Sequence, residues 1–190
     1  MSVVAIVYFS GYGHTAKQAE AVADGVRSAG ATARVYRLTD QGDLPDATTL
    51  EDVGRANAII YGSPTYMGGP AWQFKKFADA CSSIFRSQTW KNKIAAGFTN
   101  SAAVSGDKFA TVSYFWTLAM QLGQIWVGTG LLPAAQKSST PADVNWSSGF
   151  AGAHAISPAD ASVEEAPRNG DLETAKQFGK RVAELARKLS

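Results

Sequence analysis

Two glycines and two small hydroxyl residues separate an apolar run from a helix-patterned segment near the amino terminus. The stretch reads Ser10-Gly11-Tyr12-Gly13-His14-Thr15. An anion at a helix N-terminus meets unpaired backbone N–H groups and the positive end of the helix dipole. Glycines let the backbone curl closely around the anion, and the hydroxyls of Ser10 and Thr15 can donate to its oxygens. These residue types favour a site for a terminal monophosphate. An alternative stays open here, in which Thr15 only caps the helix and the glycines only turn the chain.

Two known phosphate motifs fit this stretch less well. The P-loop ends in Gly-Lys-Ser/Thr, which the sequence does not supply here. The dinucleotide pattern G-x-G-x-x-G/A is met by Gly11, Gly13 and Ala16, with Arg37 near the place where a second strand would meet an adenosine ribose. That pattern leaves the next polar loop unexplained.

Two further polar loops follow later apolar runs. Residues 61–72 contain a Ser-Pro-Thr start, Tyr66, Met67 and two glycines, and residues 98–107 are rich in small hydroxyl and amide side chains. Open parallel sheets bind ligands at the carboxyl ends of their strands, so the three loops are expected to lie together. They fit one elongated ligand with a phosphate at one end and a planar ring at the other. Tyr66 and Met67 are expected to be exposed, and Trp72 is expected to pack inside the following helix.

Strand and helix patterns alternate along the chain. The apolar periodicity predicts strands at 3–9, 32–38, 58–62, 94–98 and 125–127, and helices at 15–29, 50–56, 72–85, 108–122 and 172–189. This alternation indicates the α/β class, with a doubly wound five-stranded parallel sheet and helices on both faces. We expect a single domain over 1–190, with an irregular insertion at about 128–170 that is functional or forms an interface.

Composition excludes several classes of protein. Lysines and arginines are scattered, which argues against a nucleic-acid partner. No apolar run is long enough to span a membrane, and no basic segment precedes the first apolar run. Cys81 is the one cysteine and is expected to be a buried apolar residue, while two histidines far apart predict no metal site. A cytoplasmic location is expected.

The loops also carry a family resemblance. Tyr8 to Thr15 resembles the Y-S-x-Y-G-H-[IT] motif of the WrbA-type NAD(P)H:quinone oxidoreductases, which are flavodoxin-like proteins. Gly62-Ser63-Pro64-Thr65 and Gly68 resemble the family's G-[TS]-P-T-R-[FY]-G-N motif, with Tyr66 in place of the arginine. The similarity continues through Thr117-Leu118-Ala119 and covers nearly the whole chain.

The resemblance implies a flavoprotein that holds FMN in the three loops, with the phosphate on residues 10–15 and the flavin between the second and third loops. It further implies NAD(P)H as electron donor, a quinone acceptor, and an active site built at the contacts of a homodimer or homotetramer. The implied cofactor-binding residues are Ser10, Gly11, Tyr12, Gly13, His14, Thr15, Pro64, Thr65, Tyr66, Met67, Gly68, Gly69, Thr99, Asn100, Ser101, Ala102, Ser105 and Gly106. Tyr12, Phe85 and Gln121 are expected to line the substrate pocket, and no catalytic acid or base is assigned.

The sequence also departs from the family. Ala102, Ala103 and Val104 replace most glycines of the third loop, and Met120 and Gln121 stand where the family has a histidine pair. The missing histidine pair and Tyr66 after the third strand favour an alternative, a flavodoxin-type FMN electron carrier with protein redox partners. Such carriers usually present an acidic face to their partners, whereas this chain has a net charge of +2 and few acidic residues near the loops. A dinucleotide sensor ranks below both.

Overall fold

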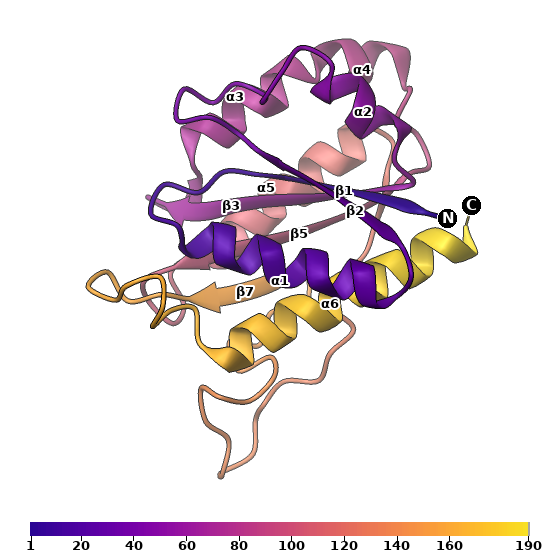
Figure 1. Ribbon diagram of the computed structural model, residues 1–190. Coiled ribbons are helices and arrows are strands. Elements are labelled where there is room, and N and C mark those ends of the chain that lie inside the picture. Colours follow the sequence, from indigo (N-terminus) through magenta and orange to yellow (C-terminus); the bar gives the residue numbers. More distant parts are fainter. Residues whose placement is uncertain (190) are drawn as a thin grey trace.

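A parallel sheet runs through the centre of the molecule. The computed structural model describes residues 1–189, and its main sheet has the strand order β2-β1-β3-β5-β6 with β7 also paired to β5 (Figure 1). The strands are β1 (Val3–Tyr8), β2 (Thr32–Arg37), β3 (Ala58–Tyr66), β4 (Gly69–Pro70), β5 (Ile94–Ser101), β6 (Ile125–Trp126) and β7 (Ala153–Ile156). Every pair is parallel except β3 with β4. This is the flavodoxin-like order, so the predicted fold class is confirmed.

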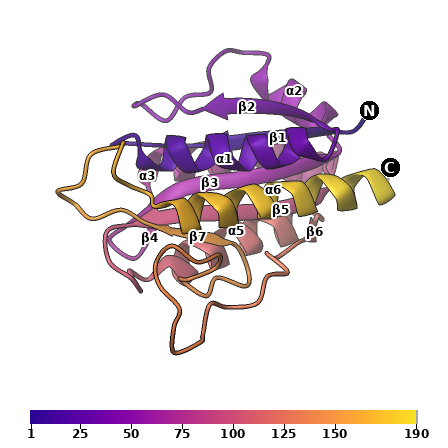
Figure 2. The same ribbon diagram turned by 60° about the horizontal axis from the view of Figure 1, so that its bottom comes forward.

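Helices cover both faces of the sheet. They are α1 (His14–Ser28), α2 (Thr49–Arg55), α3 (Trp72–Ala80), α4 (Ser82–Ser87), α5 (Lys108–Gln121) and α6 (Asn169–Lys188). Helices α1 and α6 lie side by side on one face, and the other helices lie on the opposite face (Figures 1 and 2). Successive β1 residues alternate between the two cores, because Val4 packs with α1 and α6 whereas Ala5 packs with α3 and α5. Burial on both faces explains why the strand reads as an unbroken apolar run.

Helices α1 and α6 pack backbone against backbone. A Cβ atom added at Gly25 in α1 would lie 1.9 Å from the Lys176 carbonyl oxygen, and one added at Gly179 in α6 would lie 2.1 Å from the Val22 carbonyl oxygen. No side chain fits at either crossing point, so these glycines set the distance between the two helices.

The strands β3 and β5 extend further than predicted. Strand β3 continues through the Ser-Pro-Thr segment to Tyr66 and then folds back antiparallel as β4. Met67 and Gly68 form the corner, with φ values of 47° and 78°. The hydroxyl of Ser63 accepts a hydrogen bond from the Ala71 N–H at 2.9 Å and closes the hairpin.

The helix predicted at 72–85 is broken at Cys81 into α3 and α4, and the side chain of its first residue, Trp72, is not buried as predicted. Trp72 is 61% exposed, because the buried face of α3 is formed by Phe74, Phe77 and Ala78 and Trp72 lies about 200° around the helix from Phe74. The expected packing of Trp72 is therefore wrong. Cys81 is buried as predicted, and burial raises the pKa of its thiol to about 12.

The irregular stretch is shorter than expected. Residues 153–156 form β7. Strands β6 and β7 both pair with β5, β6 with its beginning and β7 with its end, so together they occupy the place of the fifth strand. Helix α6 already begins at Asn169. Among the described residues, no helix has both the length and the apolarity needed to cross a membrane.

Candidate functional site

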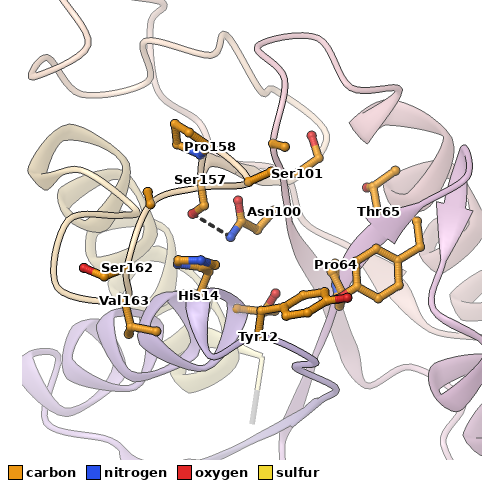
Figure 3. Close-up of a pocket in the computed structure, with 15 residues that line it drawn as sticks. Tyr12, His14, Pro64, Thr65, Asn100, Ser101, Ser157, Pro158, Ser162 and Val163 are labelled. Carbon is orange, nitrogen blue, oxygen red and sulfur yellow. Dashed lines mark hydrogen bonds between the residues drawn. The ribbon is translucent and has the colours of Figure 1, made fainter.

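A cavity of about 560 Å³ lies at the carboxyl ends of the strands (Figure 3). Its walls come from the loop after β1, the last residues of β3 and β5, and the segment after β7. The lining residues are Tyr12, His14, Thr15, Pro64, Thr65, Tyr66, Asn100, Ser101, Ala102, Ser157, Pro158, Ala159, Ala161, Ser162 and Val163. The three predicted loops therefore meet at one site, joined by a fourth segment that the sequence analysis did not include.

The first loop presents unpaired donors to this cavity. Gly13 is the N-cap of α1 with φ 89° and has no side chain to cap the helix, so Thr15 does not act as the cap that the alternative assumed. Within residues 1–189 the backbone N–H groups of residues 11–15 form no hydrogen bond, whereas Ala16 N–H donates to the Ser10 hydroxyl oxygen at 3.1 Å. Free N–H groups at a helix N-terminus attract an anion.

The second loop adds aromatic side chains. The rings of Tyr12 and Tyr66 meet edge to face with centroids 6.2 Å apart, and Tyr12 is 77% exposed. A Cβ atom on Gly11 would lie 2.6 Å from the Tyr66 hydroxyl oxygen, so a side chain there would require the Tyr66 ring to shift. Burial raises the pKa of Tyr66, with a smaller contribution from Tyr12. Met67 is fully exposed, as expected.

The third loop contributes a buried amide with an unused acceptor. Asn100 Nδ2 donates to the Ser157 hydroxyl at 2.9 Å, while Asn100 Oδ1 is buried and has no partner among the described residues. Thr99 points elsewhere, because its hydroxyl is bonded to Thr65 at 2.8 Å and to the Ser63 carbonyl at 2.7 Å. An unsatisfied buried acceptor beside a cavity is a natural place for a donor on a ligand.

A buried lysine shapes the remainder of this loop. Lys108 is 1% exposed, and its ammonium donates to the carbonyl oxygens of Ala103 at 2.5 Å and Val104 at 3.1 Å. Burial lowers the pKa of Lys108 to about 8, partly offset by Asp171. This lysine gives the loop a fixed shape where the resemblance would have placed glycines.

The predicted cofactor residues divide into two groups. Those that line the cavity are Tyr12, His14, Thr15, Pro64, Thr65, Tyr66, Asn100, Ser101 and Ala102; those that lie in the same loops without lining it are Ser10, Gly11, Gly13, Met67, Gly68, Gly69, Thr99, Ser105 and Gly106. The fourth wall, residues 157–163, was missed because the predicted fifth strand stopped at 127. Recognising Ala153–Ile156 as its continuation would have placed the following segment at the same sheet edge.

The predicted substrate pocket is not assembled within one chain. Phe85 and Gln121 line a separate hollow with Cys81 and Leu122, away from Tyr12. Helix α5 starts near the carboxyl end of β5 and ends beside its beginning, so Gln121 lies at the opposite end of the sheet from the cavity.

Comparison with known proteins decides the family. A model of the NADPH-dependent FMN reductases matches residues 1–138. The chain belongs to this family. Over 189 residues it is 43% identical to the flavodoxin FldP of Pseudomonas aeruginosa, covering 100% of this chain and 99% of the relative. It is also 32% identical over 205 residues to an NAD(P)H dehydrogenase (quinone) of Geobacter sulfurreducens, covering 98% of each.

Solved structures share the fold of this chain. A flavodoxin, WrbA-like protein from Agrobacterium tumefaciens has a TM-score of 0.80 and 40% identity, with both chains covered completely. Flavodoxin 1 of Bacillus cereus shares the fold, with a TM-score of 0.65 and 20% identity over 96% of this chain and 98% of that one. The resemblance to WrbA-type flavodoxin-like proteins is confirmed, and the predicted cofactors, FMN with NAD(P)H as electron donor, agree with the names of the family and of the relatives. The protein is an FMN-dependent oxidoreductase.

The residues of the cavity fit FMN. The unpaired N–H groups of residues 11–15 suit the phosphate, and the orphaned Asn100 Oδ1 suits an N–H on the edge of a flavin. Gly11 lets the Tyr66 hydroxyl approach the first loop closely, because a Cβ atom there would lie 2.6 Å from it.

Thr15→Val tests the phosphate end of the site. The Thr15 side chain lines the cavity and forms no hydrogen bond within residues 1–189, so valine removes a free hydroxyl at constant shape. Losing a hydrogen bond to a charged group is expected to weaken FMN binding by roughly 1.5–3 kcal/mol, or about one to two decades in Kd. Titration of the apoprotein with FMN and with riboflavin measures the effect. Thr15 is a cleaner choice than Ser10, whose hydroxyl also supports α1.

Riboflavin lacks the phosphate, so its affinity should not change in Thr15→Val. Thr117→Val is the matched control, because Thr117 is exposed on α5 and bonds only to the Ser113 carbonyl. An equal loss of FMN and riboflavin affinity would contradict the assignment of Thr15 to the phosphate.

Proposed function

We propose that this protein transfers two electrons from NAD(P)H to a quinone, with FMN bound in the cavity between the four segments. The observation that carries the proposal is the aromatic mouth formed by Tyr12 and Tyr66, where an exposed ring stands next to a cavity at the strand ends. A planar nicotinamide or quinone can stack against such rings. The relatives named NAD(P)H dehydrogenase (quinone) support the choice of donor and acceptor.

Each wall of the cavity has a separate task in this proposal. The N–H groups of residues 11–15 and the Thr15 hydroxyl hold the phosphate, and Asn100 Oδ1 accepts from the ring edge. Tyr66, whose hydroxyl lies next to Gly11, shields the flavin ring from water, and Tyr12 lines the entrance to the cavity. The chemistry itself, acceptance of a hydride and release of two electrons, is supplied by FMN.

No side chain is assigned as a catalytic acid or base. Among the residues that line the cavity in the described chain, only Tyr12, His14 and Tyr66 are titratable. His14 Nδ1 lies 3.0 Å from the Ala166 carbonyl oxygen, which orients the ring toward that carbonyl. The protein therefore acts by binding and orientation.

We also propose a homodimer or homotetramer in which a second chain completes the substrate pocket. Helix α5 exposes Phe109, Trp116 and Met120 along one side. Phe85 on α4 is also exposed and lines a hollow with Gln121 of α5. Apolar side chains gathered in this way are typical of protein–protein contacts. A neighbouring chain could bring its own Phe85 and Gln121 to Tyr12. We expect the protein to act in the cytoplasm.

A second candidate is the flavodoxin-type electron carrier. The relative named flavodoxin FldP, at 43% identity, favours it, as does the presence of Met120 and Gln121 where the resemblance has histidines. The net charge of +2 leaves no evident acidic docking face.

Turnover with a quinone separates the two candidates. We expect NADH or NADPH to bleach the flavin absorbance of the purified protein and benzoquinone to restore it, with kcat on the order of 1–1,000 per second. Stopped-flow absorbance measures both steps, light scattering measures the mass, and free FMN at equal concentration is the control. A monomer whose flavin neither nicotinamide reduces would favour the carrier.

A further inference from the structure

The outer wall of the cavity is a segment without regular structure that five hydrogen bonds hold in place. We call residues 157–166 the outer segment; Ser157, Pro158, Ala159, Ala161, Ser162 and Val163 from it line the cavity. Its first residue is fixed to the end of β5, because Ser157 N–H donates to the Ser101 carbonyl at 3.0 Å and Asn100 Nδ2 donates to the Ser157 hydroxyl. The segment begins, therefore, at the ring end of the proposed FMN site.

Its other end is fastened to the first turn of α1. The Lys17 ammonium donates to the carbonyl oxygens of Val163 at 2.6 Å and Glu164 at 3.0 Å. His14 Nδ1 lies within hydrogen-bond distance of the Ala166 carbonyl. Both side chains belong to the helix whose N-terminus carries the unpaired N–H groups. The cation nearest in sequence to the phosphate loop thus binds the outer segment.

Val163 covers the loop itself. A Cβ atom on Gly13 would lie 2.7 Å from Val163 Cγ2, which shows how closely this side chain approaches the N-cap of α1. Figure 3 shows Ser162 and Val163 on the side of the cavity next to His14, opposite Pro64 and Thr65. The phosphate end of the cavity is therefore bounded on the outside by the outer segment.

We propose that the outer segment, held by Lys17 and His14, closes the phosphate end of the cavity and makes the site selective for the mononucleotide FMN over the dinucleotide FAD. FAD carries an adenylate on the same phosphate and needs an exit at that end, which Val163 occupies. Lys17 is a positioning residue in this scheme. The inference rests on the proposed FMN site and adds the element that determines its specificity.

The test compares three ligands on the apoprotein by isothermal titration calorimetry. Lys17→Met removes the ammonium and keeps the apolar stem, and Val163→Gly removes the side chain that covers Gly13. In both variants the ratio of the FAD Kd to the FMN Kd is expected to fall about tenfold, while the riboflavin Kd stays within about twofold of the wild-type value. Lys180→Met is the matched control, because this exposed α6 lysine forms no side-chain hydrogen bond or ion pair in the described part of the chain.

Riboflavin separates loss of folding from loss of selectivity. An unchanged FAD-to-FMN ratio in both variants would overturn the inference, and so would equal losses of all three ligands, because the segment would then support the site as a whole. The proposed function can survive either result, since quinone turnover is measured separately. A wild-type apoprotein that takes up no FMN would refute the proposed function and this inference together.

Discussion

Replacing Gly25 with alanine is expected to lower the free energy of unfolding by about 3 kcal/mol or more, although the same exchange in an open helix position stabilises. The new methyl group would lie 1.9 Å from the Lys176 carbonyl oxygen and 2.9 Å from the Lys180 nitrogen. Both contacts are backbone atoms, so no rotamer change relieves them. Helices α1 and α6 must separate, and the core that they share with β1 and β3 loosens with them.

Urea denaturation of the apoprotein, followed by circular dichroism, measures this loss. Gly69→Ala is the control, because a Cβ atom there has no heavy atom within 4 Å. Combining Gly25→Ala with Gly179→Ala should cost less than the sum of the two, since either change alone already separates the helices. Equal stability of wild type and Gly25→Ala would show that the crossing can open freely.

The second large effect is a pair of opposite pH dependences that cancel in the wild type. Burial, with the charge of Lys108, lowers the pKa of His154 in β7 to about 4. Burial raises the pKa of Asp171 in α6 to about 6, although the hydrogen bond from the Ile156 N–H and the charge of Lys108 both act to lower this pKa. His154 Nε2 is buried without a partner in the described residues, whereas Asp171 Oδ2 accepts from Ile156 N–H at 2.8 Å.

The two shifts have opposite signs. His154 is held neutral in the folded state, so its contribution to the free energy of unfolding is present above its ordinary pKa of 6.5 and is lost as the pH falls toward about 4. Asp171 favours its protonated form, so its contribution is present below its ordinary pKa of 3.8 and is lost as the pH rises through about 6. Between about pH 4 and pH 6 Asp171 is protonated only in the folded state, and His154 is protonated only in the unfolded state. The two states therefore bind the same number of protons at these two groups. Wild-type stability should therefore vary little with pH in this window.

Single substitutions remove the cancellation. In His154→Phe the stability should fall as the pH rises from about 4 to about 6, and in Asp171→Asn it should fall as the pH decreases over the same range, each by up to about 1.4 kcal/mol per pH unit. The asparagine retains an oxygen for the Ile156 N–H. Urea denaturation at several pH values measures both slopes, with the wild type as reference. Slopes of the same sign in the two variants would contradict this account.

Local residue types made most of the cofactor cavity predictable. The glycines and hydroxyl residues around Thr15, Tyr66 and Asn100 can be recognised from short stretches of sequence. The order of the strands in the sheet then brings these stretches together. The outer segment was not predictable in this way, because the fifth strand breaks after Trp126 and resumes at Ala153 after a stretch with no period. Trp72 was misplaced although the pattern shows the buried face, because an apolar side chain about 200° around the helix from Phe74 does not belong to that face. Phe85 and Gln121 came from the resemblance, and within one chain they line a hollow separate from the cavity.

The divided fifth strand also affects what the sheet can do at high concentration. An open edge needs a continuous row of free N–H and C=O groups to recruit a strand from another molecule. One edge here is β2, which carries Arg34 and Arg37, and the opposite edge is shared by β6 and β7, which are only 2 and 4 residues long. Charge protects the first edge and interruption protects the second. The insertion that breaks the fifth strand is thus expected to keep neighbouring molecules from joining their sheets into aggregates.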